Sequence, residues 1–188
     1  MMPDNALSST PFPAGFTLPV KVGPLEDWEW GGVALNDPSQ GLFVQIWHLT
    51  LEGDNVCIEA PSVPKTTLFT GADITDVALA FDQNMRPFVA YTQAGNAKFW
   101  WYDPTVQMMV TTDLPGATTP RCTLDDKREF NTSGSDVILA YLKGRDLYFR
   151  MQRDRFTVEY PLATDVGSKL TTVKMGANNR LHFGIGAT

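Results

Sequence analysis

The segment DITDVALAFDQNMRPFVAYTQAGNAKFWWYDPTVQMMVTTDL, residues 73–114, decides the fold. It contains four short runs rich in β-branched and aromatic residues: Val77 to Phe81, Pro87 to Tyr91, Lys98 to Tyr102 and Gln107 to Thr112. The clusters DQN, TQAGN and DPT separate these runs, and they supply the Gly, Asn, Asp and Pro residues that chain reversals require. The segment is therefore expected to form one antiparallel blade of four strands.

Related units precede and follow this blade. VALNDPSQGLFVQIW, residues 33–47, shares with VALAFDQNMRPFVAY, residues 77–91, the opening Val-Ala-Leu, a turn with Asp and a Phe-Val pair. The repeat period is about 45 residues, as in propeller blades. We expect further blades over about 32–60, 120–162 and 168–188, with Pro61 to Ala72 as a connector and Phe156 to Tyr160 as a strand.

These repeats predict an all-β protein of antiparallel four-stranded blades. The units that we expect contain three, four, four and two strands, which is fewer than a closed propeller of four to eight blades uses. A small or incomplete β-propeller is one interpretation, and a β-sandwich is the alternative. Proteins usually cover the edges of their sheets, so closure of the ring or assembly with other chains is expected.

The two ends of the chain differ in composition. Residues 1–24 contain five prolines, which favour an extended N-terminal arm because proline lacks the donor that a helix needs. The expected anchors of this arm are Phe12, Phe16 and Leu18. Residues 25–188 are expected to form a single repeat domain. No signal peptide and no membrane span are predicted, which favours synthesis in the cytoplasm.

Charge is distributed unevenly along the chain. The net charge of −6 argues against nucleic acid as a partner, because binding to phosphates depends on basic residues. No Lys or Arg occurs between Val22 and Pro64, whereas the segment from Lys143 to Arg155 is basic. Two interpretations stay open: differently charged solvated faces, or complementary ends that meet between subunits.

Residues that commonly carry chemistry are few. The two histidines, His48 and His182, have no ligand-spaced partner, and Cys57 and Cys122 are expected to be buried thiols. No nucleophile motif and no phosphate-binding loop is present in the sequence, so we expect no enzyme activity, no metal and no cofactor. The acidic pairs at 26–27 and 125–126 leave a glycosidase-like dyad as a third alternative.

The run Phe99-Trp100-Trp101-Tyr102 permits two interpretations, because alternate residues of a strand point to opposite faces. Blade packing on both faces would bury all four rings. Otherwise Trp100 and Tyr102 would lie on a surface where they could stack on a sugar or anchor a subunit. The candidate interaction surface comprises Trp28, Trp30, Trp100, Tyr102, Arg150, Arg153 and Arg155.

The pattern VALAFDQNMRPFVAY followed by AKFWWYD resembles the blades of sialidase-like and related propellers. The SxDxGxTW box of sialidases is missing and the chain is shorter than that catalytic domain, so the resemblance does not imply hydrolysis. The repeats and the proline-rich arm also resemble virion proteins of tailed bacteriophages, particularly tail or fibre-attachment proteins. That resemblance implies a ring or trimer that assembles through its edges and its arm.

The expected function is that of a non-enzymatic structural protein. We expect a phage tail component, located in the virion, that forms a homo-oligomer and docks neighbouring virion proteins. The alternative is a carbohydrate-binding, receptor-recognition module that uses Trp100 and Tyr102 to bind a glycan. A glycosidase-like enzyme is the third interpretation.

Overall fold

The computed structural model describes residues 9–10, 26–27, 33–36, 44–60, 63–82, 84, 86–124, 136–175 and 180–186. These residues form antiparallel strands joined by turns, with one short 3₁₀ helix and no α-helix among them. The prediction of an all-β protein is confirmed. Within the described residues there is no helix long and apolar enough to cross a membrane.

The first sheet has its strands in chain order. It comprises β2 (Glu26–Asp27), β3 (Val33–Asn36), β4 (Val44–Glu52), β5 (Asn55–Ala60) and β6 (Val63–Thr70). The expectation of a connector from Pro61 to Ala72 is wrong, since β6 pairs with β5 along this segment. The strand β6 accommodates Pro64 because it is an edge strand, where a proline need not remove a ladder bond.

The second sheet is the blade expected from residues 73–114. It comprises β7 (Ile74–Phe81), β8 (Pro87–Gln93), β9 (Asn96–Asp103) and β10 (Met108–Leu114), in meander order. A short fifth strand, β1 (Ser9–Thr10), pairs with the outer edge of β10. Part of the expected arm therefore lies along its own chain. The proposed anchors Phe12, Phe16 and Leu18 fall outside the described residues.

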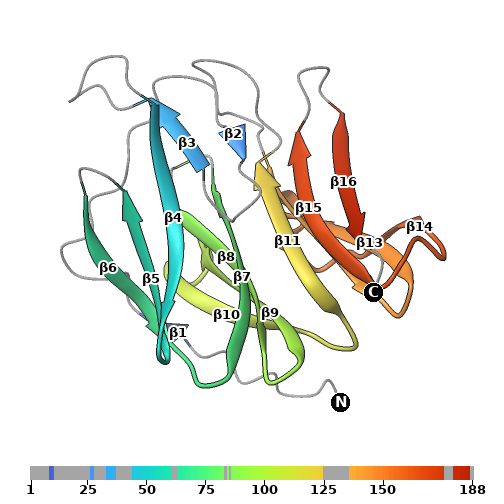
Figure 1. The fold of residues 1–188 in the computed structure, drawn as a ribbon, viewed down its shortest axis with the longest axis horizontal. Coiled ribbons are helices and arrows are strands. Elements are labelled where there is room, and N and C mark those ends of the chain that lie inside the picture. Colours follow the sequence, from blue (N-terminus) through green and yellow to red (C-terminus); the bar gives the residue numbers. More distant parts are fainter. Residues whose placement is uncertain are drawn as a thin grey trace.

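The third and fourth sheets complete the series. They comprise β11 (Thr118–Leu124), β12 (Val137–Lys143), β13 (Asp146–Met151) and β14 (Tyr160–Ala163), and then β15 (Lys169–Met175) and β16 (Leu181–Gly186). Strands β4–β6, β7–β10 and β11–β16 follow one another from left to right in Figure 1.

The expected strand from Phe156 to Tyr160 is wrong. The 3₁₀ helix η2 (Gln152–Asp154) follows β13, and Arg155 and Phe156 then adopt left-handed backbone angles, with φ of 51° and 56°. Two successive left-handed residues turn the chain sharply, so β14 begins only at Tyr160. No glycine or asparagine marks this turn in the sequence, which explains why the pattern did not predict it.

A continuous apolar core joins the first three sheets. The ring of Trp47 on β4 meets Phe81 on β7 with centroids 5.8 Å apart. Phe69 on β6 lies 5.1 Å from Tyr91 and 5.2 Å from Trp100, between centroids. The sheets therefore pack face to face in series, and β11 contacts β7, β8 and β15.

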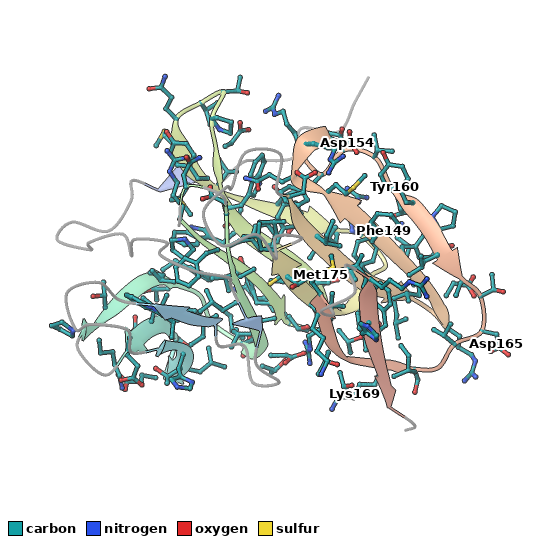
Figure 2. The ribbon with its side chains drawn as sticks, turned by 90° about the horizontal axis from the view of Figure 1, so that it is seen from above. Phe149, Asp154, Tyr160, Asp165, Lys169 and Met175 are labelled. Atoms are coloured by element: carbon teal, nitrogen blue, oxygen red, sulfur yellow. The ribbon has the colours of Figure 1, made fainter. Side chains whose placement is uncertain are left out.

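Polar contacts also link neighbouring sheets to one another. Arg121 on β11 donates to the Asp76 carboxylate on β7 at 2.7 Å and to the Thr171 carbonyl on β15 at 2.8 Å. One side chain thus links three sheets. In the third sheet Phe149 stacks on Tyr160, with ring centroids 5.0 Å apart, and Figure 2 labels both residues on neighbouring strands.

Substitution of Trp100 tests this packing directly. Its side chain is 1% exposed, so Trp100→Ala would leave a large cavity between the first and second sheets. We expect the free energy of unfolding to fall by about 3–5 kcal/mol, measured by urea titration. The control is Val106→Ala at a residue that is 47% exposed, and a loss as small as that of the control would contradict the packing.

Candidate functional site

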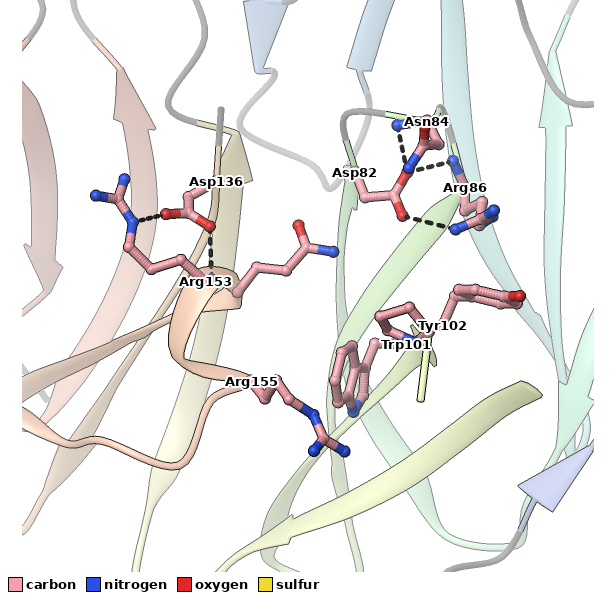
Figure 3. Close-up of a pocket in the computed structure, with 10 residues that line it drawn as sticks. Asp82, Asn84, Arg86, Trp101, Tyr102, Asp136, Arg153 and Arg155 are labelled. Atoms are coloured by element: carbon pink, nitrogen blue, oxygen red, sulfur yellow. Dashed lines mark hydrogen bonds and ion pairs between the residues drawn. The ribbon is translucent and has the colours of Figure 1, made fainter. Parts of the chain in front are cut away.

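A cleft opens between the second and third sheets, with a volume of about 280 Å³. Its walls come from the β7–β8 turn, the β9–β10 turn and the segment around η2 (Figure 3). We call it the guanidinium cleft, after the three arginines among its lining residues: Asp82, Asn84, Arg86, Trp101, Tyr102, Pro104, Asp136, Gln152, Arg153 and Arg155. Turns from two sheets therefore build one site.

Asp82 organises the first wall. Its carboxylate accepts hydrogen bonds from the backbone N–H groups of Asn84 at 2.8 Å and Arg86 at 2.9 Å. This capping by aspartate is the turn chemistry that the DQN cluster predicts. The Arg86 guanidinium then lies 3.7 Å from the centroid of the Tyr102 ring, a cation–π contact that fixes both side chains at the rim.

Two ion pairs build the opposite wall. The Asp136 carboxylate accepts a hydrogen bond from the backbone N–H of Arg153 at 2.7 Å and a second one from the Arg153 Nε. Arg155 reaches across to the second sheet, where its Nη2 donates to Asp103 at 2.6 Å. The Asp103 carboxylate also accepts the backbone N–H of Thr105 at 2.8 Å. Arg155 thus ties η2 to the β9–β10 turn.

Phe156 positions this wall from beneath. Its ring is 1% exposed and lies 5.2 Å from Phe88, 5.0 Å from Phe99 and 5.0 Å from Trp101, between centroids. The left-handed turn directs Phe156 into the core and leaves the neighbouring Arg155 at the surface. Aromatic packing therefore sets the position of the arginine.

The three ion pairs share one asymmetry. The carboxylate side chains are 6%, 5% and 7% exposed for Asp82, Asp136 and Asp103. Their partners Arg86, Arg153 and Arg155 are 28%, 55% and 51% exposed. Each pair thus points its positive end toward solvent. The groups that the three pairs expose are therefore guanidinium groups, although the pairs together carry no net charge.

Burial and hydrogen bonding set the protonation of two of these acids. Burial acts to raise the pKa of Asp103, but the hydrogen bonds from Thr105 and Arg155 outweigh it and lower the pKa below its usual value. Burial dominates at Asp82 and raises its pKa, although two backbone N–H groups oppose the shift. The pKa of Asp103 is therefore lowered first by the Thr105 backbone N–H and then by Arg155.

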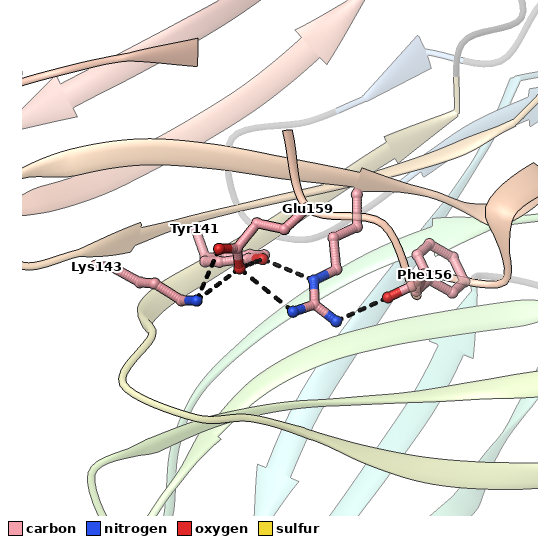
Figure 4. A network of polar contacts seen from close by, with 5 residues as sticks. Tyr141, Lys143, Phe156 and Glu159 are labelled. Atoms are coloured by element: carbon pink, nitrogen blue, oxygen red, sulfur yellow. Dashed lines mark hydrogen bonds and ion pairs between the residues drawn. The ribbon is translucent and has the colours of Figure 1, made fainter. Parts of the chain in front are cut away.

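A polar network supports the turn from the other side (Figure 4). Arg150 donates from Nε to the Tyr141 hydroxyl and from Nη1 to the Phe156 carbonyl, both at 2.8 Å. Glu159 accepts from Tyr141 at 2.5 Å and from Lys143 at 2.8 Å. Burial acts to raise the pKa of Glu159, but the bonds from Lys143, Tyr141 and Arg150 lower it.

The structure brings together only some of the predicted interaction residues. Tyr102, Arg153 and Arg155 meet at the cleft. Trp100 lies in the core at 1% exposure, so its placement on an interaction surface is wrong. The core interpretation of the aromatic run holds for Phe99, Trp100 and Trp101, whereas Tyr102 is only partly buried. Arg150 belongs to the internal network, because its guanidinium bonds to the turn that holds Phe156.

Other predicted residues cannot be placed at this site. Trp28 and Trp30 fall outside the described residues, as does the acidic pair at 125–126. The pair at 26–27 forms β2. His48 and His182 are both exposed and belong to different sheets, and Cys57 and Cys122 are both buried, as expected. Among the described residues, no group of three or more His, Cys, Asp or Glu side chains could hold a metal ion.

Sequence reasoning did not identify Asp82, Arg86, Asp103 and Asp136 as site residues. A signal existed for two of them, since Asp82 and Asp103 open the DQN and DPT turns, which follow alternate strands and so lie at the same end of the sheet. The partner of Asp82 is Arg86 in the same turn, whereas the partner of Asp103 comes from tertiary packing, since Arg155 lies 52 residues away.

The chemistry of the cleft is that of anion recognition by arginine. A guanidinium group carries five donors in a planar fork, which matches the two oxygens of a carboxylate. No protein-family model matches the chain, and comparisons with curated proteins and with solved structures also give no match. The residues of the cleft are therefore the basis for a functional proposal.

Removal of the Arg155 charge tests the link between the sheets. Arg155→Gln leaves the Asp103 carboxylate buried without its cation, so the free energy of unfolding should fall by roughly 1–3 kcal/mol at pH 7. The control Arg145→Gln removes an exposed pair with Asp165 and should change it by about 0–1 kcal/mol. Equal effects of the two substitutions in urea titrations would contradict the role of Arg155.

Glu159 should make stability depend on pH. Its folded-state pKa is lowered, so its stabilisation is present above the unfolded value of about 4.3 and is lost as the pH falls through the folded value. Glu159→Gln should therefore be less stable than the wild type at pH 7, and the difference should shrink below about pH 4. Urea titrations over this range measure it, and a difference that does not change with pH would refute the assignment.

Proposed function

We propose that the protein is a non-enzymatic structural protein that assembles with copies of itself and with neighbouring structural proteins. The observation that carries the proposal is the pairing of β1 with the outer edge of β10, with Ser9 opposite Val110 and Thr10 opposite Met109. An extended segment has thus added to a sheet edge. Edge strands offer unpaired N–H and C=O groups and readily accept another strand.

Other sheet edges support the same proposal. Among the strands that the structure describes, β6, β14 and β16 each pair on one side only. These strands lie at the outer limits of the first, third and fourth sheets. The sheets themselves are held by a continuous core and by side chains such as Arg121, so they form a rigid support for docking.

The setting that we propose is the tail of a bacteriophage particle. The chain would be made in the host cytoplasm and would then join the virion, as its resemblance to virion proteins implies. The same proposal includes the closure of its blades into a propeller, either within one chain or between chains. The contact of β15 with β2 supports closure within one chain, because it brings the last sheet to the first.

The carbohydrate-binding alternative has less support. It depended on Trp100 as a stacking platform, but Trp100 is 1% exposed. The Tyr102 ring is partly buried, and the Arg86 guanidinium covers one of its faces at 3.7 Å. Flat exposed aromatic faces are what sugar rings stack on, so assembly with protein partners is the better supported function.

The solution mass of the purified chain tests the proposal. We expect light scattering to give a mass that is a whole-number multiple of 20.8 kDa. This mass should not change when the protein is diluted moderately. A monomer at every concentration would contradict self-assembly. If that monomer also bound saccharides on a glycan array, the carbohydrate-binding alternative would replace the proposal.

A further inference from the structure

We infer that the guanidinium cleft of one copy receives an acidic tip at the opposite end of a second copy. The inference rests on the proposed assembly function and names the two surfaces that meet. We define the acidic tip as the β4–β5 turn and the β6–β7 turn, with the exposed residues Leu51, Glu52, Asp54 and Asp73.

Backbone contacts make the acidic tip a single unit. The N–H of Gly71 donates to the Asp54 carbonyl at 2.8 Å, and this bond joins the two turns. The Asp73 carbonyl accepts the N–H of Ala94 at 3.0 Å, which ties the tip to the β8–β9 turn. Three carboxylates therefore lie on adjoining turns with fixed backbones.

The charge of the tip complements the guanidinium groups that the ion pairs of the cleft expose. Glu52, Asp54 and Asp73 contribute −3, and Lys65, which pairs with Glu52, contributes +1, so the tip carries −2. The cleft presents three guanidinium groups whose own carboxylate partners are buried beneath them. Exposed carboxylates can approach these groups from solvent and form bidentate, charge-assisted hydrogen bonds.

Exposed apolar side chains lie at the tip and beside the cleft. The exposed large hydrophobic side chains of the described residues are Leu51, Val106, Val158 and Leu162. Leu51 belongs to the acidic tip. Val106 lies in the β9–β10 turn, two residues after Pro104 of the cleft lining, and Val158 lies three residues after Arg155. Contact between Leu51 and these valines would remove three exposed apolar side chains from water.

The two surfaces lie at opposite ends of the sheets. Successive strands are antiparallel, so their turns alternate between the two ends. The β4–β5, β6–β7 and β8–β9 turns share one end, which is the lower end in Figure 1, while the β7–β8 and β9–β10 turns of the cleft lie at the other. A contact between tip and cleft is therefore head-to-tail, and repetition of such a contact gives a ring or a filament.

The experiment uses two variants of the full chain and one control. The tip variant carries Glu52→Lys and Asp54→Lys, both at exposed turn positions. The cleft variant carries Arg86→Gln and Arg155→Gln. The control carries Asp113→Lys and Asp165→Lys, whose carboxylate side chains are 54% and 77% exposed and lie outside the tip, so its net charge changes as much as that of the tip variant.

Sedimentation equilibrium measures the association constant of each chain. The tip variant should associate roughly tenfold or more weakly than the wild type, whereas the control should associate like the wild type. A mixture of the tip and cleft variants should form dimers, because each mixed pair retains one intact tip and one intact cleft. The tip, cleft and control variants must each give the circular dichroism spectrum of the wild type before their association is compared.

The outcomes distinguish a failure of the contact between tip and cleft from a failure of the proposed assembly function. Equal association of the tip variant and the control, or a mixture that stays monomeric, would overturn the contact between tip and cleft and leave assembly in place through another surface. A wild-type chain that stays monomeric would overturn both.

Discussion

The burial of Phe156 is the interaction on which the rest of the candidate site depends. Two successive residues, Arg155 and Phe156, hold left-handed backbone angles, which cost free energy at any residue other than glycine. Packing of the Phe156 ring against Phe88, Phe99 and Trp101 offsets that cost. The turn is therefore held in place by the core of the neighbouring sheet.

This packing joins structure to surface chemistry. Because Phe156 enters the second sheet's core, the third sheet is fixed against the second, and Arg155 comes within 2.6 Å of Asp103. Arg150 holds the same turn through the Phe156 carbonyl. The carboxylates end beneath the surface and the guanidinium groups end above it. A chain with an excess of acidic residues thus presents guanidinium groups at the rim of this cleft.

The sequence predicted what local patterns control. Alternating apolar runs and Asp-containing turns located β7 to β10 correctly, because strand period and turn chemistry are short-range properties. Tertiary packing determined the features that local patterns did not predict. The alternation of apolar residues does not determine whether Trp100 faces solvent or another sheet. The left-handed turn at Arg155 contains no glycine, so no residue in the sequence predicts it. The segment from Pro61 to Ala72 was likewise expected to be a connector, whereas β6 pairs with β5 along it.

The candidate site was predictable in part for the same reason. Tyr102, Arg153 and Arg155 could be proposed from their residue types and from the local excess of positive charge. Their carboxylate partners could not, since Asp103 meets Arg155 only when two sheets pack together. Asp82 and Arg86 pair within one turn, whereas the pair of Asp103 with Arg155 forms only through tertiary packing.

The most direct test of this account is the association constant of Phe156→Leu, measured by sedimentation equilibrium under conditions where the chain is folded. The smaller side chain keeps an apolar core but loosens the turn that places Arg155. The account predicts association roughly tenfold weaker, equivalent to about 1.4 kcal/mol. The control Phe149→Leu changes a ring that packs on the separate cluster between the third and fourth sheets and should associate like the wild type. Unchanged association of Phe156→Leu would contradict the claim that this buried ring positions the cleft.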